Sequence, residues 1–129
     1  MTGIKYTPAL LLTTLILAGC AAAPTRDESA EFELMGSGQV PAAQLDNFSD
    51  CMMDGFDKAH TMPTAFRARK VQRSNLTRVE SMLDNSIAMS ADIHNDGRVE
   101  LYESSIASLV NLSGEKKAFA ACLERFGKQ

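Results

Sequence analysis

The sequence contains no Trp, only six Phe and two Tyr, and no excess of basic residues. Its 129 residues include 13 Lys and Arg against 16 Asp and Glu, which gives a formal net charge of −3. A dedicated nucleic-acid-binding domain normally carries a clear basic excess, and few aromatic side chains are present on which bases could stack. We therefore expect no nucleic-acid partner. A chain of this length suits one small domain and leaves little room for two.

No hydrophobic run in the sequence is long enough to span a bilayer. The mostly apolar stretch Ala9–Ala18 has about ten residues, whereas a membrane-spanning helix needs about 20. A short apolar run that follows a single cation, here Lys5, is typical of a signal peptide. We therefore expect a cleaved amino-terminal segment and no transmembrane helix.

The apolar run ends in Leu17-Ala18-Gly19-Cys20, which resembles the lipobox of bacterial lipoproteins. The resemblance covers only this segment and points to no family for the rest of the chain. It implies that residues 1–19 are a lipoprotein signal peptide and that lipidated Cys20 becomes the mature amino terminus. Two or three acyl chains hold a protein firmly on a membrane.

The residue after Cys20 indicates which membrane holds the lipid. It is Ala21, whereas an Asp at this position commonly signals retention in the inner membrane. The resemblance therefore implies a lipid-anchored protein of the outer membrane that faces the periplasm.

Only three cysteines are present, and lipidation of Cys20 would leave Cys51 and Cys122. Two remaining cysteines in an oxidising compartment are typical of a disulfide. Closing a loop of about 70 residues would stabilise the fold by roughly 4 kcal/mol in the chain-entropy model. We expect a Cys51–Cys122 disulfide, with two buried free thiols as the alternative.

Composition divides the mature chain into a tether and one domain. Residues 20–40 are expected to form a lipidated flexible tether, because they are largely polar and include Gly36-Ser37-Gly38. A short edge strand at Glu31–Met35 is the alternative for part of this segment, since its residues alternate between polar and apolar. Residues 41–129 are expected to form a single small domain.

The fold class follows from the periodicity of residues 41–129. Apolar residues recur every three or four positions over about 42–59 and again near the carboxyl terminus, which predicts two amphipathic helices. Four segments between 66 and 102 are separated by turn signals, of which Asp96-Gly97 is the strongest. The alternation of polar and apolar residues at 87–93 argues against the alternative of an all-helical protein. We predict an α+β fold, with an N-terminal helix, a four-stranded antiparallel β-meander and a C-terminal helix.

A single sheet needs a cover on its apolar face. The two helices can supply it from one side, an arrangement that would bring Cys51 near Cys122. The strand residues expected to point toward the helices are Val79, Leu83, Ile87, Met89, Ile93, Val99 and Leu101.

Acidic residues between positions 92 and 103 have a spacing that resembles the EF-hand calcium loop. At positions 1, 5, 9 and 12 of a twelve-residue window stand Asp92, Asp96, Glu100 and Glu103. Calcium prefers such oxygen ligands, and Gly97 at position 6 would permit the sharp turn. His94 at position 3 and the strand-like flanks depart from the pattern, and a hairpin also explains Asp96-Gly97. Calcium binding is therefore an alternative function.

Five basic residues occur between positions 67 and 78 with no acidic residue among them. They are Arg67, Arg69, Lys70, Arg73 and Arg78. On neighbouring strands they could gather on one solvent-facing surface and attract an anionic partner, such as lipid headgroups or an acidic protein surface. The alternative is a solvated sheet face, or an edge strand protected by its charge.

Motifs of common catalytic sites are missing from the sequence. Neither His60 nor His94 has a second His or Cys at zinc-ligand spacing. There is no nucleophile elbow, Walker sequence or Cys-x-x-Cys redox motif. We therefore expect a protein that is not an enzyme and needs no cofactor, with a small envelope hydrolase as the least favoured alternative. The leading hypothesis is an outer-membrane-anchored accessory module that binds an envelope protein or another anionic envelope component.

Overall fold

The computed structural model describes residue 3 and residues 31–60 and 65–128. They form five strands and two α-helices, which are, in chain order, β1 (Phe32–Gln39), α1 (Leu45–Lys58), β2 (Phe66–Gln72), β3 (Leu76–Leu83), β4 (Ser86–His94), β5 (Arg98–Ser104) and α2 (Ser113–Phe126). Two short 3-10 helices, η2 (Ala42–Gln44) and η3 (Ser105–Ser108), precede α1 and α2. The predicted α+β class is confirmed. The lipobox-like segment lies outside the described residues.

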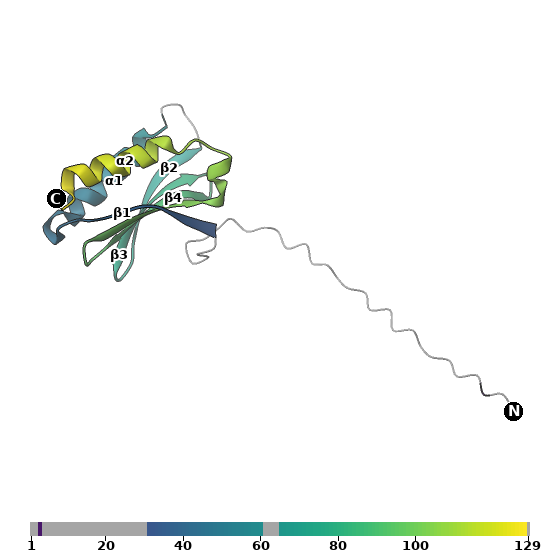
Figure 1. The fold of residues 1–129 in the computed structure, drawn as a ribbon. Coiled ribbons are helices and arrows are strands. Elements are labelled where there is room, and N and C mark those ends of the chain that lie inside the picture. Colours follow the sequence, from purple (N-terminus) through teal and green to yellow (C-terminus); the bar gives the residue numbers. More distant parts are fainter. Residues whose placement is uncertain (1–2, 4–30, 61–64, 129) are drawn as a thin grey trace.

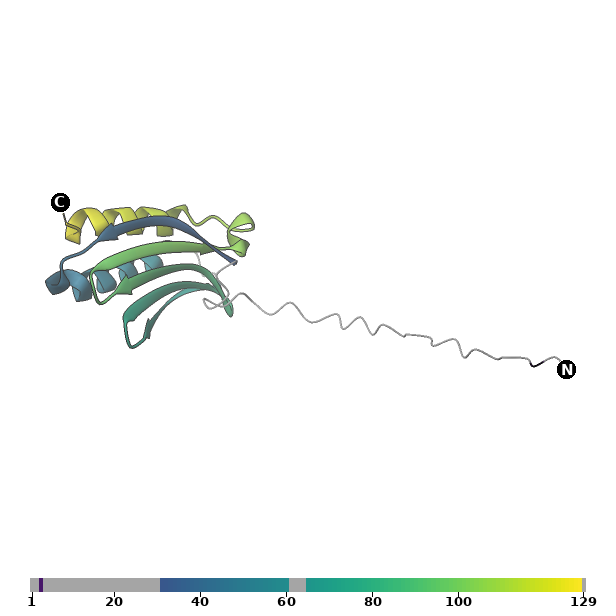
Figure 2. The same cartoon turned by 60° about the horizontal axis from the view of Figure 1, so that its bottom comes forward.

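The sheet is antiparallel, with the strand order β1-β5-β4-β3-β2. Strands β2 to β5 form the predicted meander, in which each strand pairs with the next. Helices α1 and α2 lie side by side on one face of the sheet (Figure 1, Figure 2). Among the described residues, no helix is long and apolar enough to cross a membrane.

The sheet has five strands, so the predicted number of four is wrong. Residues 32–39, which we expected to belong to the tether, form β1 and pair with β5 from Phe32↔Ser104 to Gln39↔Arg98. The glycines that suggested flexibility have a packing role instead. A Cβ atom at Gly38 would lie 2.6 Å from a methyl carbon of Leu123. Glycine therefore lets α2 lie close against β1.

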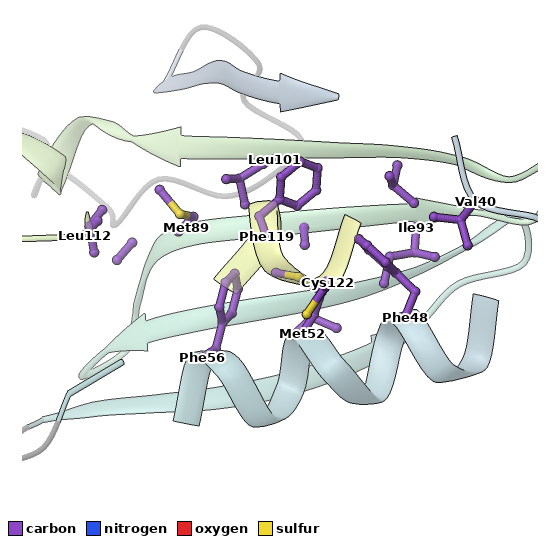
Figure 3. Close-up of a cluster of buried hydrophobic side chains, with 14 residues drawn as sticks. Val40, Phe48, Met52, Phe56, Met89, Ile93, Leu101, Leu112, Phe119 and Cys122 are labelled. Atoms are coloured by element: carbon purple, nitrogen blue, oxygen red, sulfur yellow. The ribbon is translucent and has the colours of Figure 1, made fainter. Parts of the chain in front are cut away.

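The hydrophobic core lies between the sheet and the two helices. Figure 3 shows Phe48, Met52 and Phe56 of α1 pointing toward the sheet, with Phe119 and Cys122 of α2 beside them. The predicted sheet residues in this cluster are Val79, Met89, Ile93, Val99 and Leu101. These five predictions are confirmed.

Two of the predicted core residues lie elsewhere. Ile87 is buried, but it packs with Phe32 and Met82 in a second, smaller cluster. The pairing of β3 with β4 shifts register between Ser81 and Met82, and a bulge of this kind reverses which face later side chains occupy. Leu83 is only partly exposed but belongs to neither cluster. The prediction for these two residues assumed strict alternation along the strands, which a bulge interrupts.

The Cys51–Cys122 disulfide is present and joins α1 to α2. Its Cα atoms lie 5.9 Å apart, and it links residues separated by 71 positions. Phe48 and Phe119 meet edge to face between the same two helices, with ring centroids 6.0 Å apart. The helix pair is therefore held by a covalent bond and by an aromatic contact.

The two helices are in close contact one turn from the disulfide. A Cβ atom at Gly55 would lie 2.6 Å from the Cβ atom of Ala118. Exchanging glycine for alanine in a helix normally stabilises it by about 1 kcal/mol. At this position we expect Gly55→Ala to lower the free energy of unfolding by about 1–3 kcal/mol, since overpacking must separate the helices. Urea unfolding measures the change.

A second substitution provides the control for this prediction. Ala118→Gly removes the opposing Cβ atom, so the Gly55→Ala/Ala118→Gly double variant should recover most of the loss. A Gly55→Ala protein that is more stable than wild type would show that the helices are not in close contact.

Candidate functional site

Most strand-borne charges lie on the sheet face opposite the helices, which we call the open face. Directly opposed residues in an antiparallel ladder point to the same side. The register places on this face Arg67, Arg69, Arg78, Glu80, Ser90, Asp92, Glu100 and Tyr102. Basic residues of β2 and β3 therefore lie beside acidic residues of β3 and β4, and Asp92 of β4 lies beside Glu100 of β5.

Two of the predicted basic residues neutralise buried carboxylates on the open face. Arg69 donates to Glu80 Oε1 from Nε at 3.1 Å and from Nη2 at 2.9 Å. Arg78 Nε donates to Asp92 Oδ1 at 3.0 Å. Glu80 and Asp92 are only 2% and 4% exposed, and burying a carboxylate is costly unless a cationic partner accompanies it. Arg69 and Arg78 therefore have a structural role.

The other three predicted basic residues occupy different places. Lys70 points to the helix side of the sheet and donates to Asp50 of α1 at 2.8 Å. Arg67 is exposed on the open face, and Arg73 is exposed in the β2–β3 turn. Neither forms an ion pair with another residue in the described part of the chain. The five residues therefore do not form one patch.

A hollow of about 610 Å³ opens at the β2–β3 turn. Its lining residues are Gln72, Arg73, Ser74, Asn75, Leu76 and Arg78. The turn is held at its base, because Arg73 N donates to Leu76 O at 2.9 Å. It is also attached to the β4–β5 turn, because Asn95 N donates to Asn75 O at 3.0 Å and Asn95 Nδ2 donates to Ser74 O at 3.3 Å.

The four candidate calcium ligands are not brought together. Glu103 lies on the helix side of β5, where its carboxylate meets Lys116 of α2 at 3.0 Å. Asp92 and Glu100 lie on the open face, and Asp96 caps the turn by accepting from Arg98 N at 3.0 Å. Asp96-Gly97 forms a hairpin turn, with Gly97 at φ +95°. Within the described ranges, no group of three or more His, Cys, Asp or Glu is arranged to hold a metal ion.

His94 belongs to a polar network on the open face. Its Nε2 lies 2.7 Å from Glu100 Oε1, and Tyr102 donates its hydroxyl hydrogen to Glu100 Oε2 at 3.0 Å. Arg98 Nε lies 3.6 Å from the same glutamate. No serine or threonine hydroxyl in residues 31–60 and 65–128 is hydrogen-bonded to His94. The network is thus an arrangement of charges without an activated nucleophile.

His60 forms a second contact with a glutamate, inside the protein. The imidazole follows the end of α1, stacks on Phe66 with centroids 3.7 Å apart, and hydrogen-bonds to Glu115 in the first turn of α2. Glu115 is fully buried. Burial raises the pKa of its carboxyl group, while the nearby His60 and hydrogen bonds to the carboxylate oppose that rise. The two residues are 55 positions apart, so no local motif could have indicated this pair.

Comparison of the chain with protein-family models, with curated proteins and with solved structures found no match. Function must therefore be inferred from the chemistry of this chain's own residues.

Proposed function

We propose that this chain is a lipoprotein anchored in the outer membrane through Cys20, and that its domain is a non-catalytic binding module for another envelope component. The observation that supports this most is the division of the cysteines. Cys51 and Cys122 are bonded to each other, so Cys20, at the end of the lipobox-like segment, is the one cysteine left for another modification. Structural disulfides persist mainly outside the cytoplasm.

The arrangement of charges on the open face favours binding over catalysis. Arg69 and Arg78 fix the buried carboxylates of Glu80 and Asp92 in place, which gives a rigid patterned surface. Exposed Arg67 and Arg73 add positive charge to it and to the adjoining turn. Such a surface suits recognition of an acidic envelope component.

The anchor would hold the domain close to the membrane. Strand β1 begins at Phe32, so eleven residues (21–31) separate it from Cys20. A chain of eleven residues spans no more than about 40 Å when it is fully extended. The proposed tether is therefore about half the length expected from the sequence. The end of the sheet where β1 starts would face the membrane.

Fractionation of cells tests the anchor. We expect the wild-type protein in the outer-membrane fraction and Cys20→Ser in the soluble periplasmic fraction, because the serine cannot form the lipid thioether. Retention of Cys20→Ser in the membrane fraction would contradict the proposal.

Site-specific photocrosslinking tests the binding surface in the same cells. A crosslinker in place of Arg67 on the open face should capture a partner. A crosslinker in place of Glu124, exposed on α2, should not. Equal capture from both positions would mean that the open face is not the recognition surface.

A further inference from the structure

Two arginines with guanidinium nitrogens that no ion pair uses lie together at the β2–β3 turn. Arg73 is exposed and makes no ion pair with a described residue. Arg78 uses only Nε to bind Asp92, so neither Nη1 nor Nη2 has a hydrogen-bond partner among the described residues. Neither nitrogen is among the fully buried, unpaired atoms of the described residues, so both are accessible to a ligand in solution. Both arginines line the hollow at the β2–β3 turn.

The rest of the hollow supplies neutral hydrogen-bond donors. Ser74 and Asn75 contribute a hydroxyl and an amide. Two guanidinium groups with amide and hydroxyl donors are the chemistry that proteins use to bind carboxylate or phosphate.

The hollow lies at the end of the sheet away from the start of β1. Phe32, the first residue of β1, pairs with Ser104 at the end of β5, whereas the β2–β3 turn bonds to the β4–β5 turn at the other end. Figure 1 shows β1 starting opposite these two turns. With the chain anchored through Cys20, the hollow would face away from the membrane that holds it.

We propose that this hollow binds an oxyanion, a carboxylate or a phosphate, carried by a partner and not by the lipid headgroups of the anchoring membrane. Arg73 and the free terminal nitrogens of Arg78 hold the anion. The orientation of the hollow relative to the membrane rests on the proposed lipid anchor, whereas the binding of an oxyanion does not. A failure of the anchor would therefore leave the proposed oxyanion site untouched, and the reverse also holds.

Titration of the full-length chain in neutral detergent tests the site. The probes are inorganic phosphate, a short Glu-rich peptide and vesicles containing anionic lipid, and binding is followed by the NMR shifts of the Ser74 and Asn75 amides. We expect saturable binding of phosphate or of the peptide, and whichever binds more tightly identifies the source of the oxyanion.

A matched pair of variants tests whether binding depends on the hollow or only on the overall positive charge. Arg73→Gln should weaken binding about tenfold, the usual scale for losing a charged hydrogen bond. Lys117→Gln, which removes an exposed charge of α2 outside the hollow, should weaken it less than about twofold. Arg78 is replaced only by lysine, because Asp92 needs a cation. Equal losses in the Arg73 and Lys117 variants, no saturable binding, or binding to anionic vesicles alone would overturn the proposal.

Discussion

Replacing Cys51 and Cys122 together by alanine is expected to lower the free energy of unfolding by about 4 kcal/mol. The disulfide links residues 71 positions apart, and the chain-entropy model gives a loss of this size for such a loop. In a domain of about 100 residues, that loss lowers Tm by roughly 15–30 °C. Thermal unfolding followed by circular dichroism measures it.

Two controls separate the disulfide from other effects of the substitution. Adding reductant to the wild-type protein should produce a similar loss without changing any side chain. Cys20→Ser, which leaves the disulfide in place, should unfold at the wild-type temperature. A double alanine variant within 1 kcal/mol of wild type would show that the packing of α1 on α2 needs no covalent link.

Replacing His60 by alanine is expected to lower the free energy of unfolding at pH 7 by about 3 kcal/mol. The substitution leaves Glu115, which is fully buried, without its hydrogen-bond partner. Removing one member of a buried ion pair usually costs about 3–5 kcal/mol. The stacking of His60 on Phe66 is lost as well, and that part of the effect does not depend on the charge of Glu115.

The loss should depend on pH in a defined direction. Burial raises the pKa of Glu115 above its ordinary value of 4.5, so the folded state binds this proton more tightly than the unfolded state. Stability that depends on such a group is greatest at low pH and falls as pH rises through the folded pKa. Without His60, which opposes the rise, the pKa goes higher still. The His60→Ala defect should therefore shrink between pH 7 and pH 4.

A Glu115→Gln background provides the control for this pH dependence. Glutamine fills the same space and cannot ionise, so His60→Ala should cost less in that background at pH 7, and the loss should no longer contain the pH dependence that comes from Glu115. Urea unfolding of the four proteins at pH 4 and pH 7 makes the comparison. A His60→Ala loss that is equal at the two pH values in the Glu115 protein would contradict a buried, titrating glutamate.

Periodicity and the turn signals were sufficient to predict the helices and strands β2 to β5, and the number of cysteines was sufficient to predict the disulfide. Helix packing on one face of the meander is what brings Cys51 to Cys122. Strand β1 was anticipated only as the alternative of a short edge strand at Glu31–Met35, because Gly36 and Gly38 usually mark flexible segments, whereas here they make room for α2. The sequence did not indicate that Ile87 points to the opposite face of the sheet, because a bulge adds one residue to a strand without changing the local composition.

The candidate site was less predictable, because it depends on which strands become neighbours. Alternation alone places Arg69 and Lys70 on opposite faces. Only the register across β2, β3 and β4 shows that Arg69 meets Glu80 and that Arg78 meets Asp92. The basic segment therefore indicated positive charge correctly but not which charges are free. The contact of His60 with Glu115 depends on the packing of two helix ends, which no local sequence pattern encodes.

The proposed anchor is tested most directly by the mass of the amino-terminal peptide of the protein purified from membranes. The account predicts a peptide that starts at Cys20 and carries a diacylglyceryl group on the thiol, together with a separate Cys51–Cys122 linked peptide. An unmodified Cys20 still joined to residues 1–19, on protein recovered from the cytosol, would contradict it.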